Sequence, residues 1–349
     1  MQNYVWNIAS QMAEAQRETV KLQKLTVIVF LIHLFAVVCL WVFGKLILPI
    51  IFFALIIEWA IASFLIINVY KLGDNITSQN KKETASSIFK EFWIYCLPFI
   101  PYAWLSFAHD FGDYWMLQHW GGSKQQAYYS VANQIAAVSL LATTSILRIF
   151  WKEIAEANHR GDIQKVRFLY KKVTRILYTM GAILAGGLLP WSDEIIHLLL
   201  GSAYLGATLT FSIMIFYPVH QSLGQINGTM LLATEKGKAH VIIGICFLAS
   251  SILVSYLVLA PSTLFVPGLN LGSEGLAFKM VIMQLIVVNV MGYVVAKFIG
   301  SKYDWFYQLL GLLLATIAGL VSKLIITSLI SMPLIIQMIL FGFLLSFTK

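Results

Sequence analysis

The sequence predicts an all-α integral membrane protein with about ten transmembrane helices. Hydrophobic residues make up 59% of the 349 residues and charged residues 11%, far fewer than the roughly one-quarter of charged residues in a soluble domain. The apolar residues gather in ten runs, each near the ~20 residues that a helix needs to cross the hydrocarbon core. The Lys and Arg residues alternate between the gaps that separate these runs, which is typical of a chain that crosses a membrane repeatedly.

The ten runs follow one another with short gaps, none of them long enough for a folded soluble domain. The first 24 residues are polar and mixed in charge, which is unlike a secretory signal and indicates a cytoplasmic amphipathic segment. The apolar runs cover residues 25–44, 46–70, 92–111, 126–147, 174–191, 205–232, 239–260, 273–296, 304–328 and 332–348.

The positive charges set the predicted topology. Of the 24 Lys and Arg residues, twenty fall in every second gap, and the intervening gaps hold only Lys45 and Lys124. Because basic loops stay on the cytoplasmic side, both termini are predicted to be cytoplasmic. Lys279 and Lys323 lie inside runs near their outer ends, and we expect their long side chains to reach the interface.

Three irregular segments carry local signals. The basic gap 149–173 resembles a helix that lies on anionic lipid. Ser192, followed by two acids and a stop at Gly201, predicts a short outer helix. The uncharged, turn-rich segment 261–272 predicts a short outer hairpin or loop. Pro98 and Pro101 predict a bent third helix, since each proline removes a backbone donor.

Composition and motifs argue against several classes of function. The net charge of +8 is explained by cations placed at one membrane face, so no nucleic-acid partner is expected. Cys39, Cys96 and Cys246 lie inside runs and indicate no disulfide framework. The sequence has no Gly-rich phosphate loop followed by Lys and no metal-ligand spacing. Neither a cofactor nor enzymatic activity is therefore expected.

Ionisable groups inside apolar runs nominate functional sites, because hydrocarbon penalises them. His33 and Glu58 lie near the middles of the first two runs, where they would meet at the same depth. Such a pair has coupled protonation and is a candidate for ion coupling; an inert pair that only fixes helix packing is the alternative.

The third run ends with His109, Asp110 and, one turn later, Asp113. Asp110 is the candidate for the substrate cavity, and Asp113 is expected in water as a helix-end acid. Arg148, at the inner end of the fourth run, has the geometry to bind a phosphate, with a topology-setting arginine as the alternative. The other polar candidates for a cavity, on the fourth and sixth runs, are Tyr129, Asn133, Gln134, His220 and Gln221.

From about residue 92 to 280 the chain resembles the Wzx-like, lipid-linked oligosaccharide flippases in the polysaccharide-transporter branch of the multidrug/oligosaccharidyl-lipid/polysaccharide (MOP) exporter superfamily. The resemblance consists of an ordered series of short features, of which no single one is diagnostic. They are Pro98 followed by Asp110, AYYSVANQI at 127–135, the basic Gly161-Asp-Ile loop, LLLGSAY at 198–204, LLATEKGK at 231–238 and LGSEGLA at 271–277.

The resemblance implies two six-helix lobes around a cavity, followed by two extra helices. On that alignment the ten runs match the last ten of fourteen family helices, and the first four have no counterpart. The implied parts are a truncated first lobe at 25–70, a cytoplasmic linker at 71–91, a complete second lobe at 92–299 and an extra pair at 300–349.

The resemblance also implies the function, which is to move an undecaprenyl-diphosphate-linked oligosaccharide across the inner membrane by alternating access. Membrane lipids, a polysaccharide polymerase and a chain-length regulator are then the expected partners. A multidrug cation exporter of the same superfamily and a non-transporting scaffold in a glycan assembly complex are the alternatives. A membrane glycosyltransferase or polymerase would instead show a long outer loop with catalytic residues.

Overall fold

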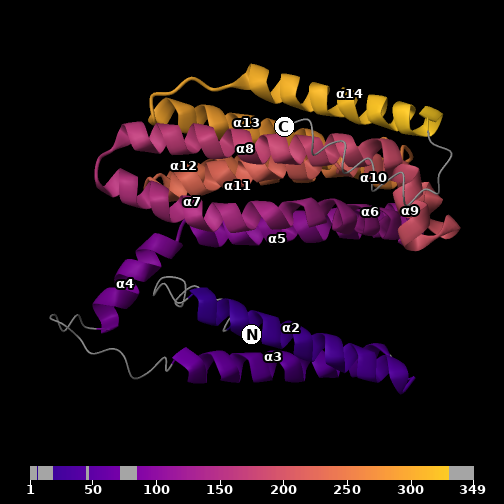
Figure 1. The fold of residues 1–349 in the computed structure, drawn as a ribbon, viewed down its shortest axis with the longest axis horizontal. Helices are drawn as coiled ribbons and strands as arrows, with labels where there is room; N and C mark the ends of the chain where they lie inside the picture. Colours follow the sequence, from indigo (N-terminus) through magenta and orange to yellow (C-terminus); the bar gives the residue numbers. More distant parts are fainter. Residues whose placement is uncertain (1–5, 7–18, 45–46, 71–84, 330–349) are drawn as a thin grey trace. The chain divides into compact units, whose positions relative to one another are not determined.

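The computed structural model describes residues 6, 19–44, 47–70 and 85–329, and the regular structure in those ranges is helical (Figure 1). The chain divides into two units, residues 1–88 and 89–349, which are described separately. Most of the predicted amphipathic segment 1–24, residues 71–84 of the predicted linker and the tenth run lie outside the described residues.

The first unit contains a pair of long apolar helices that pack against each other. Helix α2 spans Thr19–Val42 and α3 spans Leu48–Tyr70. Gly44 has φ +63°, a left-handed conformation that ends α2 in a tight turn. Few side chains are buried, and large apolar ones such as Phe30, Phe35 and Phe64 are exposed, as expected of helices that face lipid.

The second unit begins with helices that are interrupted within two of the predicted spans. Helix α4 covers Ala85–Cys96, and α5 covers Phe99–Met116, continued by a π-turn at Leu117–Gly121. Helix α6 covers Gly122–Ala137, and the 3₁₀ turn Val138–Leu140 separates it from α7, Leu141–His159. The break between α4 and α5 falls at Pro98, as the prolines predict, because proline lacks the N–H that a continuous helix needs.

The remaining helices complete the second unit. Helix α8 covers Ile163–Leu188, and the 3₁₀ turn Leu189–Trp191 leads to the short α9, Ser192–Leu200. A 3₁₀ segment, Ser202–Ala207, precedes α10, Thr208–Met214, and α11 follows at Tyr217–Ala233 after a bend of about 40°. Helices α12, α13 and α14 cover Gly237–Leu259, Gly272–Phe298 and Trp305–Leu329.

The prediction of a separate interfacial helix at 149–173 is wrong. Helix α7 continues to His159, and α8 begins at Ile163 after a turn at Gly161, where φ is +72°. Asp162 caps α8 by accepting the N–H of Lys165 at 2.9 Å. The two helices extend beyond their apolar runs as charged, solvated ends, and hydropathy detects only the apolar part of each.

Two local predictions of secondary structure are confirmed. Helix α9 starts at Ser192 and ends at Gly201, whose φ of +79° suits glycine. Residues 261–271 form a loop that folds back on α12, with the N–H of Leu269 bonded to the Leu257 carbonyl at 2.8 Å. In the second unit the α7–α8 turn lies at one end of the bundle and α9 at the other (Figure 1).

The all-α, multi-pass membrane fold is confirmed. In the described ranges six helices are long and apolar enough to cross a membrane, or seven if the bent α10–α11 pair forms one span. This is fewer than the ten predicted runs because 92–111 and 126–147 are interrupted and 332–348 lies outside the described residues. Large apolar side chains such as Trp104, Leu253 and Phe306 remain exposed on the bundle, where lipid would cover them.

Candidate functional site

A polar cavity of about 560 Å³ lies in the second unit between α5, α11, α12 and α13. This volume is within the range typical of small-molecule sites. Half of its 22 lining residues are polar, and most of these carry neutral hydrogen-bonding groups; the others are apolar side chains, such as Phe247 and Met283, and glycines. The polar residues that line it are Tyr102, Ser106, His109, Asp110, Tyr217, Gln221, Gln225, Thr229, His240, Ser251 and Gln284.

Glycines on α11 keep this cavity open. Gly224 and Gly228 are four residues apart, so both lie on the face of α11 that lines the cavity. A Cβ atom at Gly224 would lie 2.8 Å from Nε2 of Gln284, the amide that donates to Oε1 of Gln221 at 2.6 Å. The missing side chain therefore leaves room for an amide pair that joins α11 to α13 at the cavity wall.

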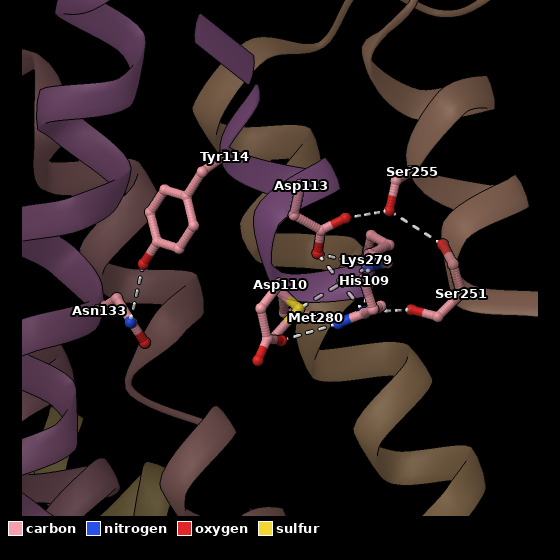
Figure 2. A network of polar contacts seen from close by, with 9 residues as sticks. All are labelled: His109, Asp110, Asp113, Tyr114, Asn133, Ser251, Ser255, Lys279 and Met280. Carbon is pink, nitrogen blue, oxygen red and sulfur yellow. Dashed lines mark hydrogen bonds and ion pairs between the residues drawn. The ribbon is translucent and has the colours of Figure 1, made fainter. Parts of the chain in front are cut away.

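Beside the cavity lies a buried ion pair. The Nζ atom of Lys279 on α13 is 2.8 Å from Oδ2 of Asp113 on α5, and the two side chains are 0% and 5% exposed. Lys279 also approaches Nε2 of His109 at 3.1 Å. Figure 2 shows α5, α12 and α13 converging on this group, which we call the ion network: His109, Asp113, Ser251, Ser255 and Lys279.

Helix α12 completes the ion network through two serines one turn apart. Nε2 of His109 is 2.9 Å from Oγ of Ser251, and the hydroxyl of Ser255 donates to Asp113. Nδ1 of His109 lies 2.9 Å from Oδ1 of Asp110. These contacts fit a neutral imidazole that donates from Nδ1 to Asp110 and accepts at Nε2, because an ammonium group can only donate.

The ion network reaches the cavity surface. His109 and Ser251 line the cavity, whereas Asp113 and Lys279 lie behind them. The acid and the ammonium group neutralise each other, so the charge of Asp113 is not available to a cationic ligand. Removal of either partner would leave an uncompensated buried charge.

No protein-family model matches the sequence, and no curated protein sequence matches it. Solved structures do match. One is described as an outward-facing multidrug resistance MATE family transporter of the MOP superfamily, with a TM-score of 0.56 and 14% identity. Another, from Pyrococcus furiosus, is described as a MOP superfamily transporter whose reversed pocket polarity suggests a different function, with a TM-score of 0.57 and 13% identity.

The chain therefore shares its fold with these solved transporter structures. Each match covers 71% of this chain and 55% of the chain in the solved structure. This chain therefore spans little more than half the length of these structures. At this identity the likeness shows the fold.

The structure brings two of the predicted cavity residues to the cavity. Asp110 lines it with a side chain that is 70% exposed, and Gln221 lines it through the amide pair. The backbone of Arg148 lies in α7, and its side chain is outside the described part of the structure.

Four predicted residues lie elsewhere. Tyr129 is buried, with its ring edge-on to Tyr114 at 5.7 Å. Nδ2 of Asn133 is 3.5 Å from the Tyr114 hydroxyl, and Gln134 is exposed. Figure 2 shows the Tyr114–Asn133 contact separate from the ion network. His220 faces a second cavity, because neighbouring residues on one helix point in different directions.

His33 and Glu58 meet in the first unit, as their positions predict. Nδ1 of His33 is 2.6 Å from Oε2 of Glu58, and the side chains are 40% and 11% exposed. The contact joins α2 to α3.

The expectation that Asp113 lies in water and that Lys279 reaches the interface is wrong, since both side chains are buried in the ion network. Lys323 contacts the segment around α9 at one end of the bundle: its Nζ atom is 2.6 Å from Oε1 of Glu194 and 2.5 Å from the Pro190 carbonyl, and its side chain is 27% exposed. The sequence contained one signal for the pairing of Asp113 with Lys279: the two residues have opposite charges and lie near the predicted outer ends of two apolar runs, and hydrocarbon favours pairing of such charges.

The described residues contain no cluster of three His, Cys, Asp or Glu side chains suited to a metal ion.

Proposed function

We propose that this chain belongs to a flippase that moves an undecaprenyl-diphosphate-linked oligosaccharide between the leaflets of the bacterial inner membrane. The observation that carries the proposal is the lining of the cavity, which is rich in amide and hydroxyl groups. These groups can pair with sugar hydroxyls, and the rings of Tyr102 and Tyr217 can cover the apolar faces of sugar rings.

The charge of the cavity favours a polar substrate over a cation. Asp110 is the one carboxylate among the described lining residues, and the nearby Asp113 is neutralised by Lys279. Drug cations are stabilised by several buried or focused acids, because each acid compensates for the lost hydration. The cavity supplies a single solvated one.

A multidrug cation exporter is the second candidate. The 70% exposed carboxylate of Asp110 in the cavity wall and the fold shared with a MATE family transporter described as conferring multidrug resistance favour it. A non-transporting scaffold in a glycan assembly complex is the third candidate.

We assign the parts of the flippase as the sequence resemblance implies. Residues 25–70 form the end of the first lobe, 71–91 the linker, 92–299 the second lobe and 300–349 the extra pair, with both termini in the cytoplasm. Transport proceeds by rocking of the two lobes against each other. A polysaccharide polymerase and a chain-length regulator are the proposed protein partners.

The deciding experiment uses the purified chain in proteoliposomes. Transfer of a fluorescent undecaprenyl-diphosphate-linked oligosaccharide between leaflets and efflux of ethidium are measured on the same preparation. A Gln221→Leu/Gln284→Leu double variant removes the amide pair, and Asp110→Asn removes the exposed charge.

For a flippase, the double variant loses at least tenfold in oligosaccharide transfer and Asp110→Asn retains most of it. Ethidium efflux that depends on Asp110, without oligosaccharide transfer, establishes the cation exporter instead. If the wild-type chain moves neither compound but retains the polymerase in a pull-down, the scaffold is the correct function.

We further propose that His33 and Glu58 couple transport to an ion gradient, since an imidazole and a carboxylate meet at 2.6 Å between two apolar helices. Glu58→Gln should remove the gradient dependence of transfer. Glu156→Gln is the matched control, because Glu156 also pairs with a basic residue, Arg160, but on an exposed surface. Unchanged gradient dependence in Glu58→Gln removes the coupling role and leaves the packing role.

A further inference from the structure

A second cavity, of about 480 Å³, lies between α8, α11, α13 and α14. We call it the α14 cavity. Most of its wall is apolar, from residues such as Phe216, Leu285, Leu309, Leu312 and Ile317. From Trp305 to Ile317, both of which line it, α14 rises about 18 Å. This is close to the ~15 Å of hydrocarbon in one leaflet.

A basic cluster adjoins one end of the α14 cavity. A small neighbouring pocket shares Tyr178 and Gln308 with the cavity and is lined by Lys171, Arg175 and Lys302. Lys302 lies in the loop between α13 and α14, and Lys171 and Arg175 contact Asp304 of the same loop. The positive-inside rule places this loop in the cytoplasm.

The basic cluster has more positive charge than its own acid neutralises. Asp304 lies 2.6 Å from Arg175 and 3.8 Å from Lys171, so two cations share one carboxylate. The side chains of Arg175 and Lys171 are 45% and 55% exposed, and Arg175 is held over the ring of Tyr307 at 5.1 Å. With Lys302 the cluster has three cations and one acid. Its net positive charge therefore favours binding of an anion.

We propose that the α14 cavity and the basic cluster together bind one anionic phospholipid. The phosphate headgroup pairs with Lys171, Arg175 and Lys302, and an acyl chain extends along α14 into the apolar cavity. Basic pockets between membrane helices on the cytoplasmic side bind anionic headgroups by this charge complementarity. The site is distinct from the polar cavity of α5, α11, α12 and α13, and does not depend on which compound that cavity transports.

Two other occupants fit less well. The apolar run 332–348 of the same chain contains no acidic residue, so it offers nothing to the basic cluster. A free phosphate would use the cluster but would leave the apolar cavity unused. A lipid with an anionic head satisfies both parts.

The test is native mass spectrometry of the purified full chain in detergent, titrated with phosphatidylglycerol and, separately, with phosphatidylcholine. Two variants address the two parts of the site. Lys171→Gln/Arg175→Gln removes headgroup charge from exposed side chains, and Thr316→Phe fills part of the cavity. Lys172→Gln is the matched control, because Lys172 is adjacent on α8 but contacts the Phe168 ring instead of the cluster.

The wild-type chain is expected to retain one phosphatidylglycerol in preference to phosphatidylcholine. Affinity for phosphatidylglycerol should fall about twenty-five-fold in the double variant, from roughly fivefold for each charge, and should not change in Lys172→Gln. In Thr316→Phe the bound lipid should be lost while the chain keeps its unfolding temperature.

Three results would overturn the proposal. Retention without preference for phosphatidylglycerol would show a nonspecific apolar groove. No retained lipid in the wild type would mean that the chain covers the cavity itself. Displacement of phosphatidylglycerol by equimolar undecaprenyl phosphate would assign the site to the isoprenoid lipid. Each experiment measures bound lipid and not transport. Failure of the lipid proposal can therefore be distinguished from failure of the proposed oligosaccharide transfer.

Discussion

At the scale of single residues, the pairing of Lys279 with Asp113 has the largest energetic consequences. Both side chains are almost completely enclosed by α5, α12 and α13. An isolated charge at such a position is expensive, whereas a paired and hydrogen-bonded one is tolerated. The pair thus fixes α13 against α5 with a charge-neutral contact.

Lys279→Met should therefore destabilise the protein by about 3–5 kcal/mol, because Asp113 would remain buried without its partner. Thermal unfolding in detergent measures the effect. The double variant Lys279→Met/Asp113→Leu removes both charges and should recover most of the stability. A single variant as stable as the wild type would show that Asp113 is neutral without Lys279.

Lys323→Met provides a milder comparison at the same scale. The Lys323 and Glu194 side chains are 27% and 24% exposed, so water screens their interaction more than that of the buried pair. We expect a loss of about 1 kcal/mol in the same unfolding assay. A loss equal to that of Lys279→Met would contradict the role of burial.

The variant Gly224→Val tests whether the shape of the polar cavity matters for transport. In Gly224→Val the new side chain would occupy the space of the Gln284 amide and disrupt its contact with Gln221. Oligosaccharide transfer in proteoliposomes should decrease at least tenfold, while Gly112→Ala, where a Cβ meets only the end of Met116 at 3.8 Å, should behave like the wild type. Full transfer in Gly224→Val would exclude the amide pair from substrate contact.

At the scale of helices, α8 and α14 approach through their backbones. A Cβ atom at Gly186 would collide with the Ala315 carbonyl, and one at Gly319 would collide with the Gly186 carbonyl. Small residues permit such close crossings between membrane helices, where packing and not the hydrophobic effect drives association.

Gly186→Leu should push α14 away from α8 and cost about 1–3 kcal/mol through overpacking, measured as a lower unfolding temperature. Gly311→Ala on α14 is the control, because its Cβ would lie at an ordinary 3.6 Å from the Tyr178 ring. Equal unfolding temperatures for the two variants would show that the crossing tolerates a wider spacing.

At the scale of the whole molecule, the distribution of positive charge predicts which end of the helical bundle faces the cytoplasm. The α7–α8 turn is basic, and the loop 261–271 between α12 and α13 is uncharged. The positive-inside rule therefore places the two segments on opposite sides of the membrane.

Cysteine labelling checks this topology in a variant that lacks Cys39, Cys96 and Cys246. Phe265→Cys in the outer loop should react with an impermeant maleimide in intact spheroplasts. Arg160→Cys in the α7–α8 turn, 68% exposed, should react only after permeabilisation. The reverse pattern would invert the topology and with it the direction of the proposed transport.

The sequence by itself determined the all-α membrane fold, the turn-rich loop at 261–271, the short helix α9 and the break at Pro98. These features depend on local chemistry: hydropathy over about twenty residues, a helix-start serine, glycine at a positive φ and a missing proline N–H. The contact of His33 with Glu58 was also predictable, because a tight turn places the two at similar depth.

Only the tertiary structure decided which polar groups form the site. Asp113 and Lys279 are 166 residues apart, and their pairing depends on the packing of α5, α12 and α13. Asn133 and Gln134 are as polar as the cavity residues, but the rotation of α6 directs them elsewhere. Hydropathy gives the depth of a side chain along a helix, whereas the direction in which it points is set by the neighbouring helices that pack against it.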